Sequence, residues 1–139
     1  ILAMKQLWME ETGEYHGEFV SFDAAYSEPK PIQRPYPPII LGGETDHTLK
    51  RVIEYCDGWL PRGRGGFDPV ESKQRLTKMA EAGGRDPASL SITVFGAPAD
   101  RAELDKYEQA GIDCALLQMP TVKRDDCMKR LEAITPLVG

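Results

Sequence analysis

Short apolar runs alternate with longer amphipathic segments along most of this sequence, and this alternation constrains the fold more than any other feature. From residue 39 onward the pattern predicts four strands, over 39–41, 57–60, 90–95 and 114–119, each followed by a helix. Such strict alternation implies a parallel sheet with right-handed crossovers. The pattern fits either a small doubly wound sheet or part of a (β/α)8 barrel, of which four units would be half.

The predicted helices have apolar faces and recognisable ends. After the first strand, four apolar residues recur at positions i, i+3, i+4 and i+7, namely Leu49, Val52, Ile53 and Cys56. Asp68-Pro69 begins the next helix, because aspartate is a preferred N-cap and proline suits the first turn. The last two helices are expected over 99–110 and 123–134.

Residues 1–38 depart from this alternation. A helix is predicted over 1–11, and 12–38 are expected to form an irregular or hairpin insertion with a lead-in that holds five of the eleven prolines. We expect residues 1–139 to form a single domain, in which 39–139 hold the four strand–helix units. The chain opens inside a helical pattern with no capping residue, so we expect it to be a piece of a longer one.

Composition excludes several classes of protein. A formal net charge of −5 argues against general nucleic-acid binding, and no apolar run reaches the roughly 18 residues that a membrane span needs. Cys56, Cys114 and Cys127 fit neither a zinc pattern nor a disulfide framework, which indicates a reducing compartment such as the cytoplasm. We expect these thiols to pack as small hydrophobes in strand and helix interiors. Neither His16 nor His47 has a predicted partner arranged for acid–base work or metal binding. We predict no metal site, and the catalytic residues stay unknown at this point.

An ordered set of motifs resembles the luciferase-like monooxygenase family. The segment EPKPIQRPYPPIILGG, residues 28–43, is similar to the family segment that enters the fifth barrel strand. Further along, Asp57-Gly58-Trp59 resembles the sixth strand, and Gly84-Arg85-Asp86-Pro87 resembles the close of the sixth helix. Residues 110–113 and 116–120 resemble the eighth unit, so the similarity runs across nearly the whole chain.

The resemblance implies an α/β fold that is the C-terminal half of a TIM (β/α)8 barrel, with four parallel strands corresponding to strands 5–8 of the parent barrel. The first four strands are absent. In relatives they supply much of the flavin-ring pocket, part of the substrate pocket and an unusual non-proline cis peptide. We therefore expect the isolated chain to be an incomplete enzyme, and whether it is active alone stays open.

A candidate anion site follows the first strand, because barrel ligands lie at the C-terminal ends of strands. Gly42 and Gly43 let the backbone approach a ligand closely, and the N-terminus of the next helix favours a phosphate. In flavin-binding relatives, an acidic residue and two hydroxyl residues hold the FMN phosphate here. The residues that match are Glu44, Thr45 and Thr48. The alternative is that Thr45 or Asp46 only caps the helix and the glycines only turn the chain.

Other candidates follow the later strands. Arg62 and Arg64, in the glycine-rich loop after the second strand, are candidates for holding a phosphate or an acidic tail. A plain solvated loop, or a contact with RNA, is the alternative for this loop. Trp59 is either a wall of the cofactor pocket or a buried core residue. Gln118, at the end of the last strand, is a further candidate ligand contact.

The sequence therefore predicts part of a flavin- or deazaflavin-dependent oxidoreductase, in which the cofactor carries the redox chemistry. FMN and coenzyme F420 are near equal candidates. The alternative is a non-catalytic half-barrel that self-associates, because an open half-barrel leaves strand edges unpaired and an apolar face uncovered. The expected partners are the cofactor, a small-molecule substrate, and either a second copy in a homodimer or the missing N-terminal half.

Overall fold

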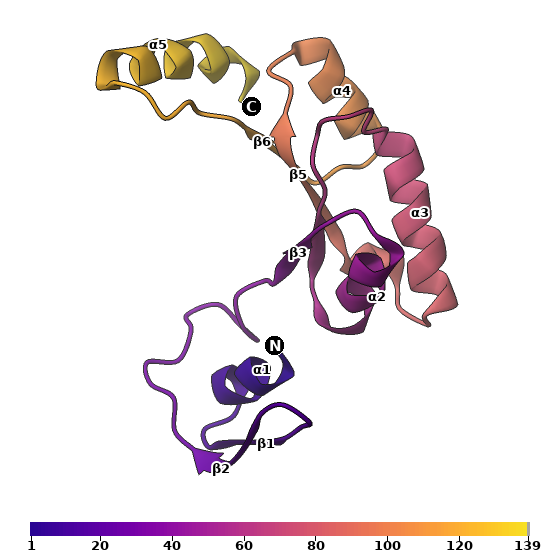
Figure 1. Ribbon diagram of the computed structural model, residues 1–139, viewed down its shortest axis with the longest axis vertical. Helices are drawn as coiled ribbons and strands as arrows, with labels where there is room; N and C mark the ends of the chain where they lie inside the picture. The colour runs from indigo at the N-terminus through magenta and orange to yellow at the C-terminus, as the bar shows by residue number, and fades with distance from the viewer. Residues whose placement is uncertain (139) are drawn as a thin grey trace. The chain divides into compact units, whose positions relative to one another are not determined.

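The computed structural model describes residues 1–138 and divides into two compact units, residues 1–39 and 40–139. Figure 1 labels the helices and most of the strands of both. The division falls within one residue of the point where the sequence predicts the first strand of the alternating region. We describe each unit by itself.

The first unit contains one helix and a hairpin. Its elements are α1 (Leu2–Met9), β1 (Gly13–His16) and β2 (Ser21–Ala25), and the two strands pair antiparallel. Helix α1 has no side-chain cap at Ile1, and it is shorter than the helix predicted over 1–11. Its carbonyl end is held by Lys30, whose Nζ donates to the backbone oxygens of Leu7 and Glu10 at 2.9 and 2.7 Å. A cation at this position also complements the helix dipole.

The second unit is a four-stranded parallel sheet with the order β3-β4-β5-β6. The strands are β3 (Ile40–Gly42), β4 (Gly58–Leu60), β5 (Ser91–Ala97) and β6 (Cys114–Leu117). The helices between and after them are α2 (Asp46–Tyr55), α3 (Pro69–Ala82), α4 (Arg101–Gln109) and α5 (Arg124–Ile134). Short 3-10 turns are η1 (Pro87–Ser89) and η2 (Thr135–Leu137). The four predicted strand–helix units are all present, with boundaries shifted by a few residues.

The helix starts follow from their capping residues. Asp68 accepts a hydrogen bond from the N–H of Glu71 at 2.9 Å, and Asp100 accepts one from Glu103 at 3.1 Å. Each carboxylate satisfies an N–H group that the first turn of a helix leaves without an intrahelical partner. The predicted start of α3 at Asp68-Pro69 is therefore confirmed.

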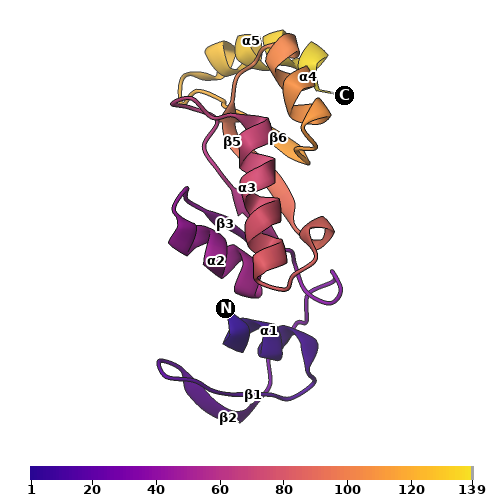
Figure 2. The same ribbon diagram turned by 90° about the vertical axis from the view of Figure 1, so that its right-hand side faces the viewer.

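The strand register decides which side chains meet the helices. Leu41 lies beside Trp59, and Trp59 lies beside Ile92, so these three side chains share one face of the sheet. Helices α2, α3 and α4 lie on one side of the sheet, as the two views in Figures 1 and 2 show. The core lies between these layers. Its largest fully buried side chains are Trp59, Leu49, Leu76, Ile92, Val52, Val94, Pro61 and Cys56.

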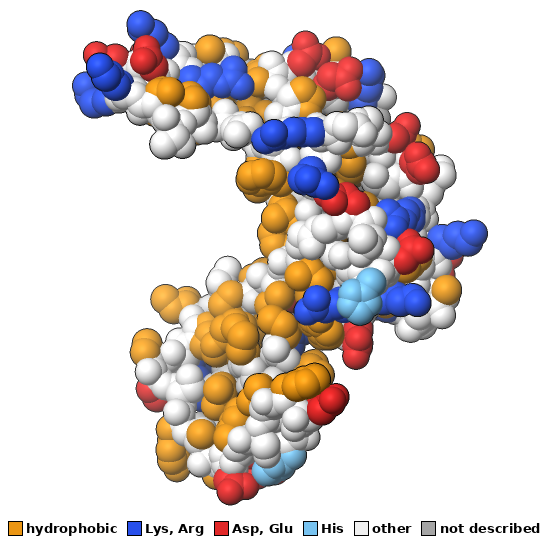
Figure 3. Space-filling model, in the orientation of Figure 1, with side chains coloured by type: hydrophobic (Ala, Val, Ile, Leu, Met, Phe, Trp, Pro, Cys, Tyr) orange, Lys and Arg blue, Asp and Glu red, His pale blue; other side chains and the backbone are white. Residues whose placement is uncertain are grey.

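The opposite face of the sheet is apolar and open in this unit. Because side chains alternate along a strand, Ile40, Phe95 and Leu116 point to this face, and they are 40%, 46% and 41% exposed. Hydrophobic side chains are visible here along the edge of the sheet that turns away from the helices (Figure 3). Exposed apolar faces of this kind are typical of surfaces that contact another part of a protein or a partner.

The cysteines do not all behave as the sequence predicted. Cys56 is buried, as expected, whereas Cys127 is only partly covered and its thiol donates to the carbonyl of Pro120 at 3.3 Å. Cys114 is exposed. The prediction was wrong for Cys114 because this residue stands beside Thr93 on the open face of the sheet, where no helix packs.

The core makes a first testable prediction. Leu76 of α3 is 2% exposed, so Leu76→Ala should lower the free energy of unfolding by about 2–5 kcal/mol through lost burial and a residual cavity. Leu131→Ala in α5 is the matched control, because Leu131 is 45% exposed. Urea unfolding followed by circular dichroism measures both, and equal losses would contradict the assignment of the core.

Candidate functional site

The C-terminal ends of three neighbouring strands form the candidate site. A pocket of about 380 Å³ lies here, lined by Gly42, Gly43, Glu44, Leu60, Arg62 and Phe95. A neighbouring pocket of about 490 Å³ shares three of these residues and adds Arg64 and Gly65. The structure thus brings together five of the residues that the sequence singled out, which come from two different loops. Their position at the carboxyl edge of a parallel sheet is where such sheets bind ligands.

The loop from β3 to α2 is shaped by Gly43 and Thr45. Gly43 has a φ of +123°, which L-residues with a side chain rarely adopt, and a Cβ there would lie 2.8 Å from Thr48 Oγ1. Thr45 is the N-cap of α2, and its Oγ1 accepts the N–H of Thr48 at 3.1 Å. The two threonine hydroxyl oxygens lie 3.0 Å apart. Capping and a paired hydroxyl cluster therefore coexist, so the two alternatives for this loop are not exclusive.

Glu44 faces an arginine in the structure. Arg62 Nε and Nη2 donate to the two carboxylate oxygens of Glu44 at 2.9 and 3.0 Å, and the Arg62 backbone N–H donates at 3.2 Å. This two-pronged geometry is the strongest that an arginine offers a carboxylate. Hydrogen bonding from the guanidinium is the main reason that the pKa of Glu44 lies below its usual value, and the same pairing raises the pKa of Arg62.

Arg64 is exposed and binds a neutral partner. Its Nη2 donates to Gln118 Oε1 at 3.1 Å, which links the loop after β4 to the end of β6. Gly65 and Gly66, which follow Arg64, have φ values of +67° and +84°, and a Cβ at either position would meet no described atom within 4 Å. Arg64 thus lines the second pocket from a loop with open space beside its glycines, and its hydrogen-bond partner is uncharged.

Trp59 lies beneath the site as a core residue. It is 2% exposed, and its Nε1 donates to the carbonyl of Gly43 at 2.6 Å. Its ring therefore supports the β3–α2 loop from below. Like Thr45 and Thr48, it is not among the residues that line the two pockets. The hydrogen bond satisfies the one polar atom of a buried indole.

Arg75 of α3 is a residue that the sequence analysis missed. Its Nη1 donates to the carbonyl of Glu44 at 2.9 Å, and its Nη2 donates to Asp46 Oδ1 at 2.5 Å. This pairing lowers the pKa of Asp46. The partners lie 31 and 29 residues away in sequence, so only the packing of α3 beside α2 reveals the contact.

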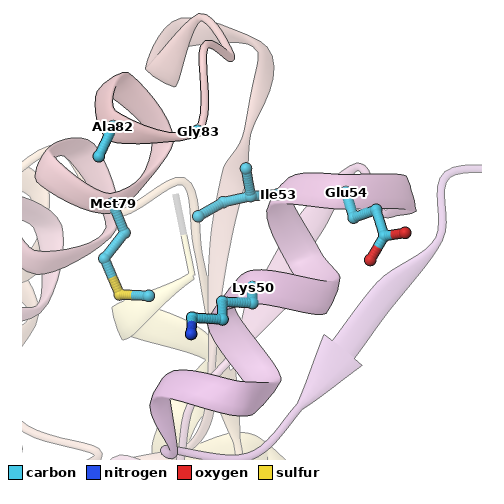
Figure 4. Close-up of a pocket in the computed structure, with 6 residues that line it drawn as sticks. All are labelled: Lys50, Ile53, Glu54, Met79, Ala82 and Gly83. Atoms are coloured by element: carbon cyan, nitrogen blue, oxygen red, sulfur yellow. The ribbon is translucent and has the colours of Figure 1, made fainter.

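A larger groove lies on the helix layer. It has a volume of about 520 Å³ and is lined by Lys50, Ile53, Glu54, Met79, Ala82 and Gly83. Figure 4 shows that α2 and α3 provide its walls and that Glu54 points away from the other side chains. No cluster of polar groups converges in it, in contrast to the strand ends.

His16 is the last residue of β1, in the hairpin of the first unit. His16 does have polar neighbours, because its Nδ1 lies 2.9 Å from Ser21 Oγ and its Nε2 lies 3.8 Å from Asp23 Oδ1. The hairpin places β2 beside His16, and Asp23 is fully exposed. Within residues 1–138 no group of three or more histidine, cysteine or acidic side chains could hold a metal ion. The helices of the same residues are too short or too polar to cross a membrane.

The architecture is part of a (β/α)8 barrel. The chain resembles a solved structure described as an F420-dependent secondary alcohol dehydrogenase in complex with an F420-acetone adduct, with a TM-score of 0.67 and 14% sequence identity. The match covers 98% of this chain and 59% of that one. The predicted fold class is therefore confirmed.

The family follows from the sequence match. The profile described as luciferase-like monooxygenase matches residues 1–115, and the chain belongs to this family. An uncharacterized protein of Mycobacterium tuberculosis (strain ATCC 25618 / H37Rv) is 31% identical over 135 residues, which are 95% of this chain and 46% of that protein. The FMNH(2)-dependent dimethylsulfone monooxygenase of Pseudomonas putida is 40% identical over 63 residues, which are 45% of this chain and 17% of that enzyme. The chain spans less than half the length of these relatives.

The geometry of Gly43 predicts that a substitution there destabilises the fold more than a substitution of its neighbour Gly42. Gly43→Ala should lower the free energy of unfolding by about 1–3 kcal/mol, because alanine is strained at this φ and its Cβ would crowd Thr48. Gly42→Ala is the control, since a Cβ there would lie 3.7 Å from the nearest described atom, the carbonyl oxygen of Leu60. Urea unfolding compares the two, and a milder effect of Gly43→Ala would contradict the loop conformation.

The Glu44–Arg62 pair predicts that the stability of the fold depends on pH. Since folding lowers the pKa of Glu44 from its usual 4.5, the pair stabilises the fold above about pH 4.5 and loses this effect as the pH falls through the lowered pKa. The stability difference between the wild type and Glu44→Gln should therefore shrink below that pH. Glu81→Gln is the control, because Glu81 has no ion pair among the described residues. An equal pH trend in both variants would argue against the pair.

Proposed function

We propose that the loop between β3 and α2 binds the phosphate of a flavin or deazaflavin cofactor, and that the chain is part of an oxidoreductase of its family. The observation that carries the proposal is the pair of hydroxyls of Thr45 and Thr48, 3.0 Å apart, beside two glycines at the carboxyl edge of the sheet. The first turn of α2 adds N–H groups and a positive dipole end, which favour an anion.

The local charges support an anionic ligand. Glu44 and Asp46 are the two carboxylates nearest the loop, and each is paired with an arginine, Arg62 and Arg75 respectively. Neither carboxylate therefore presents an uncompensated negative charge to a phosphate. Among the described residues, the hydrogen-bond partner of the Arg64 side chain is the neutral amide of Gln118, so its charge is available for a second anionic group of the ligand.

The names of two similar proteins support two candidate cofactors. One relative is named as FMNH(2)-dependent, and the structural neighbour is named as F420-dependent. Both cofactors carry a phosphate and differ in what lies beyond it, since F420 continues into an acidic tail. When bound, either would supply hydride transfer at its ring system, and the residues described here would hold its phosphate end. The ring and substrate pockets would require further strands of the barrel.

The test is a fluorescence titration of the purified chain with FMN, F420 and riboflavin, which lacks the phosphate. Thr48→Val should weaken the binding of the phosphorylated cofactor by about tenfold, because one hydroxyl hydrogen bond is lost. The variant keeps the backbone N–H that Thr45 accepts, so the cap of α2 is preserved. Thr77→Val in α3, away from the strand ends, is the matched control. If the wild type binds riboflavin as tightly as FMN, and F420 not at all, the phosphate site is rejected.

We propose as a second function that the open face of the sheet mediates assembly into a closed barrel, with a second copy in a homodimer. The supporting observation is the exposure of Phe95 and Leu116, 46% and 41%, on strands that stand side by side. Closing such a face buries apolar area and pairs the free strand edges. Completion by the other half of a longer chain would cover the same face.

Light scattering after size-exclusion chromatography tests self-association. The wild type should elute as a dimer, and Leu116→Asp should elute as a monomer, because a carboxylate would be buried without a partner. Val70→Asp is the control, since Val70 is 52% exposed and lies on α3 at the helix layer. A monomeric wild type would exclude this assembly.

A further inference from the structure

Arg75 contacts the loop that is proposed to bind phosphate but lies outside both pockets. Its guanidinium reaches from α3 to the carbonyl of Glu44 at 2.9 Å and to the carboxylate of Asp46 at 2.5 Å. The side chain is 35% exposed and does not line the cavity at the strand ends. Its two hydrogen-bond partners belong to the loop and to the first residue of α2.

The contact fixes the direction of one peptide group. The peptide between Glu44 and Thr45 is trans, so its C=O and its N–H point in opposite directions. Because Arg75 holds the Glu44 oxygen toward α3, the N–H of Thr45 is turned away from α3. A rotation of this peptide would point a carbonyl oxygen, instead of an N–H group, at an anion.

Trp59 does the same for the preceding peptide. Its Nε1 holds the oxygen of Gly43 at 2.6 Å on the helix side of the sheet, so the N–H of Glu44 points the other way. Two successive carbonyls are thus held by donors behind the loop, and two successive N–H groups are left to face away from the helix layer. Neighbouring backbone N–H groups that face the same side of a loop are a known form of anion site.

We propose that Arg75 is a positioning residue of the anion site: by holding the Glu44 carbonyl and Asp46, it turns the Thr45 N–H toward the bound phosphate. The inference rests on the proposed function and adds a residue to it. Arg75 prevents the peptide from rotating and neutralises Asp46, so that the phosphate meets a donor and no free carboxylate.

A purely structural role is the competing explanation, and the chain offers a matched control for it. Arg85 follows α3 and donates from Nη1 to the carbonyl of Ile53 at 2.9 Å, at the opposite end of α2. Arg75 and Arg85 thus both tie a backbone carbonyl at one end of α2 to the α3 region. Only Arg75 touches the loop that precedes α2.

The experiment measures the ratio of the dissociation constants of riboflavin and FMN in the wild type, Arg75→Met, Arg75→Lys and Arg85→Met. If the wild type binds F420, the same ratio is measured with F420 and its phosphate-free form. Arg75→Met should reduce the phosphate preference by about tenfold, with the affinity for the phosphate-free compound unchanged. Arg75→Lys should recover part of the preference, because an ammonium can hold one of the two oxygens. Arg85→Met should leave the ratio as in the wild type.

Three results overturn the inference. If Arg75→Met keeps the wild-type ratio, or weakens both ligands equally as Arg85→Met does, Arg75 has no positioning role and the phosphate site stands without it. If the wild type itself shows no preference for a phosphorylated ligand, the proposed function fails and removes the basis of the inference. Circular dichroism and thermal unfolding of each variant identify misfolding, and Arg75→Lys provides the decisive ratio if Arg75→Met does not fold.

Discussion

The apolar layer between the sheet and helices α2 and α3 is the constraint on which the rest of the second unit depends. Trp59, Leu49 and Leu76 are almost fully buried in this layer. Burial of the indole fixes its Nε1 below the β3–α2 loop, where it holds the carbonyl of Gly43. The packing of α3 beside α2 places Arg75 within reach of the same loop. The hydrophobic core thus determines both the stability of this unit and the orientation of polar groups at its carboxyl edge.

Paired charges at the strand ends compensate the two carboxylates of this edge, despite the acidic composition of the chain. The two carboxylates of the loop, Glu44 and Asp46, each accept hydrogen bonds from an arginine on a different element. Arg64 is left with an uncharged partner. A net charge of −5 is therefore a poor guide to the local field, because that field depends on which charges are paired and where the helix dipole ends.

The sequence predicted the strands and helices well because their signals are local. The spacing of apolar residues, the N-capping residues and the glycines that end an element predicted α2, α3 and the four strands. The motif at residues 28–43 indicated the family. The contacts that organise the site are long-range, so the sequence did not predict that Arg62 would pair with Glu44 or that Arg75 would reach Asp46. The exposure of Cys114 was missed for a related reason, since an alternating strand does not reveal which of its faces a helix covers.

The conformation of the loop after β4 determines which sequence changes this edge of the sheet can accept. At Gly65 and Gly66 the backbone is left-handed and surrounded by solvent, so that asparagine or a short insertion meets little steric resistance there. The sheet and its buried tryptophan tolerate far less, because any change there disturbs close packing. Sequence changes can therefore accumulate in the loop after β4 while the core keeps the conformation of the loop between β3 and α2.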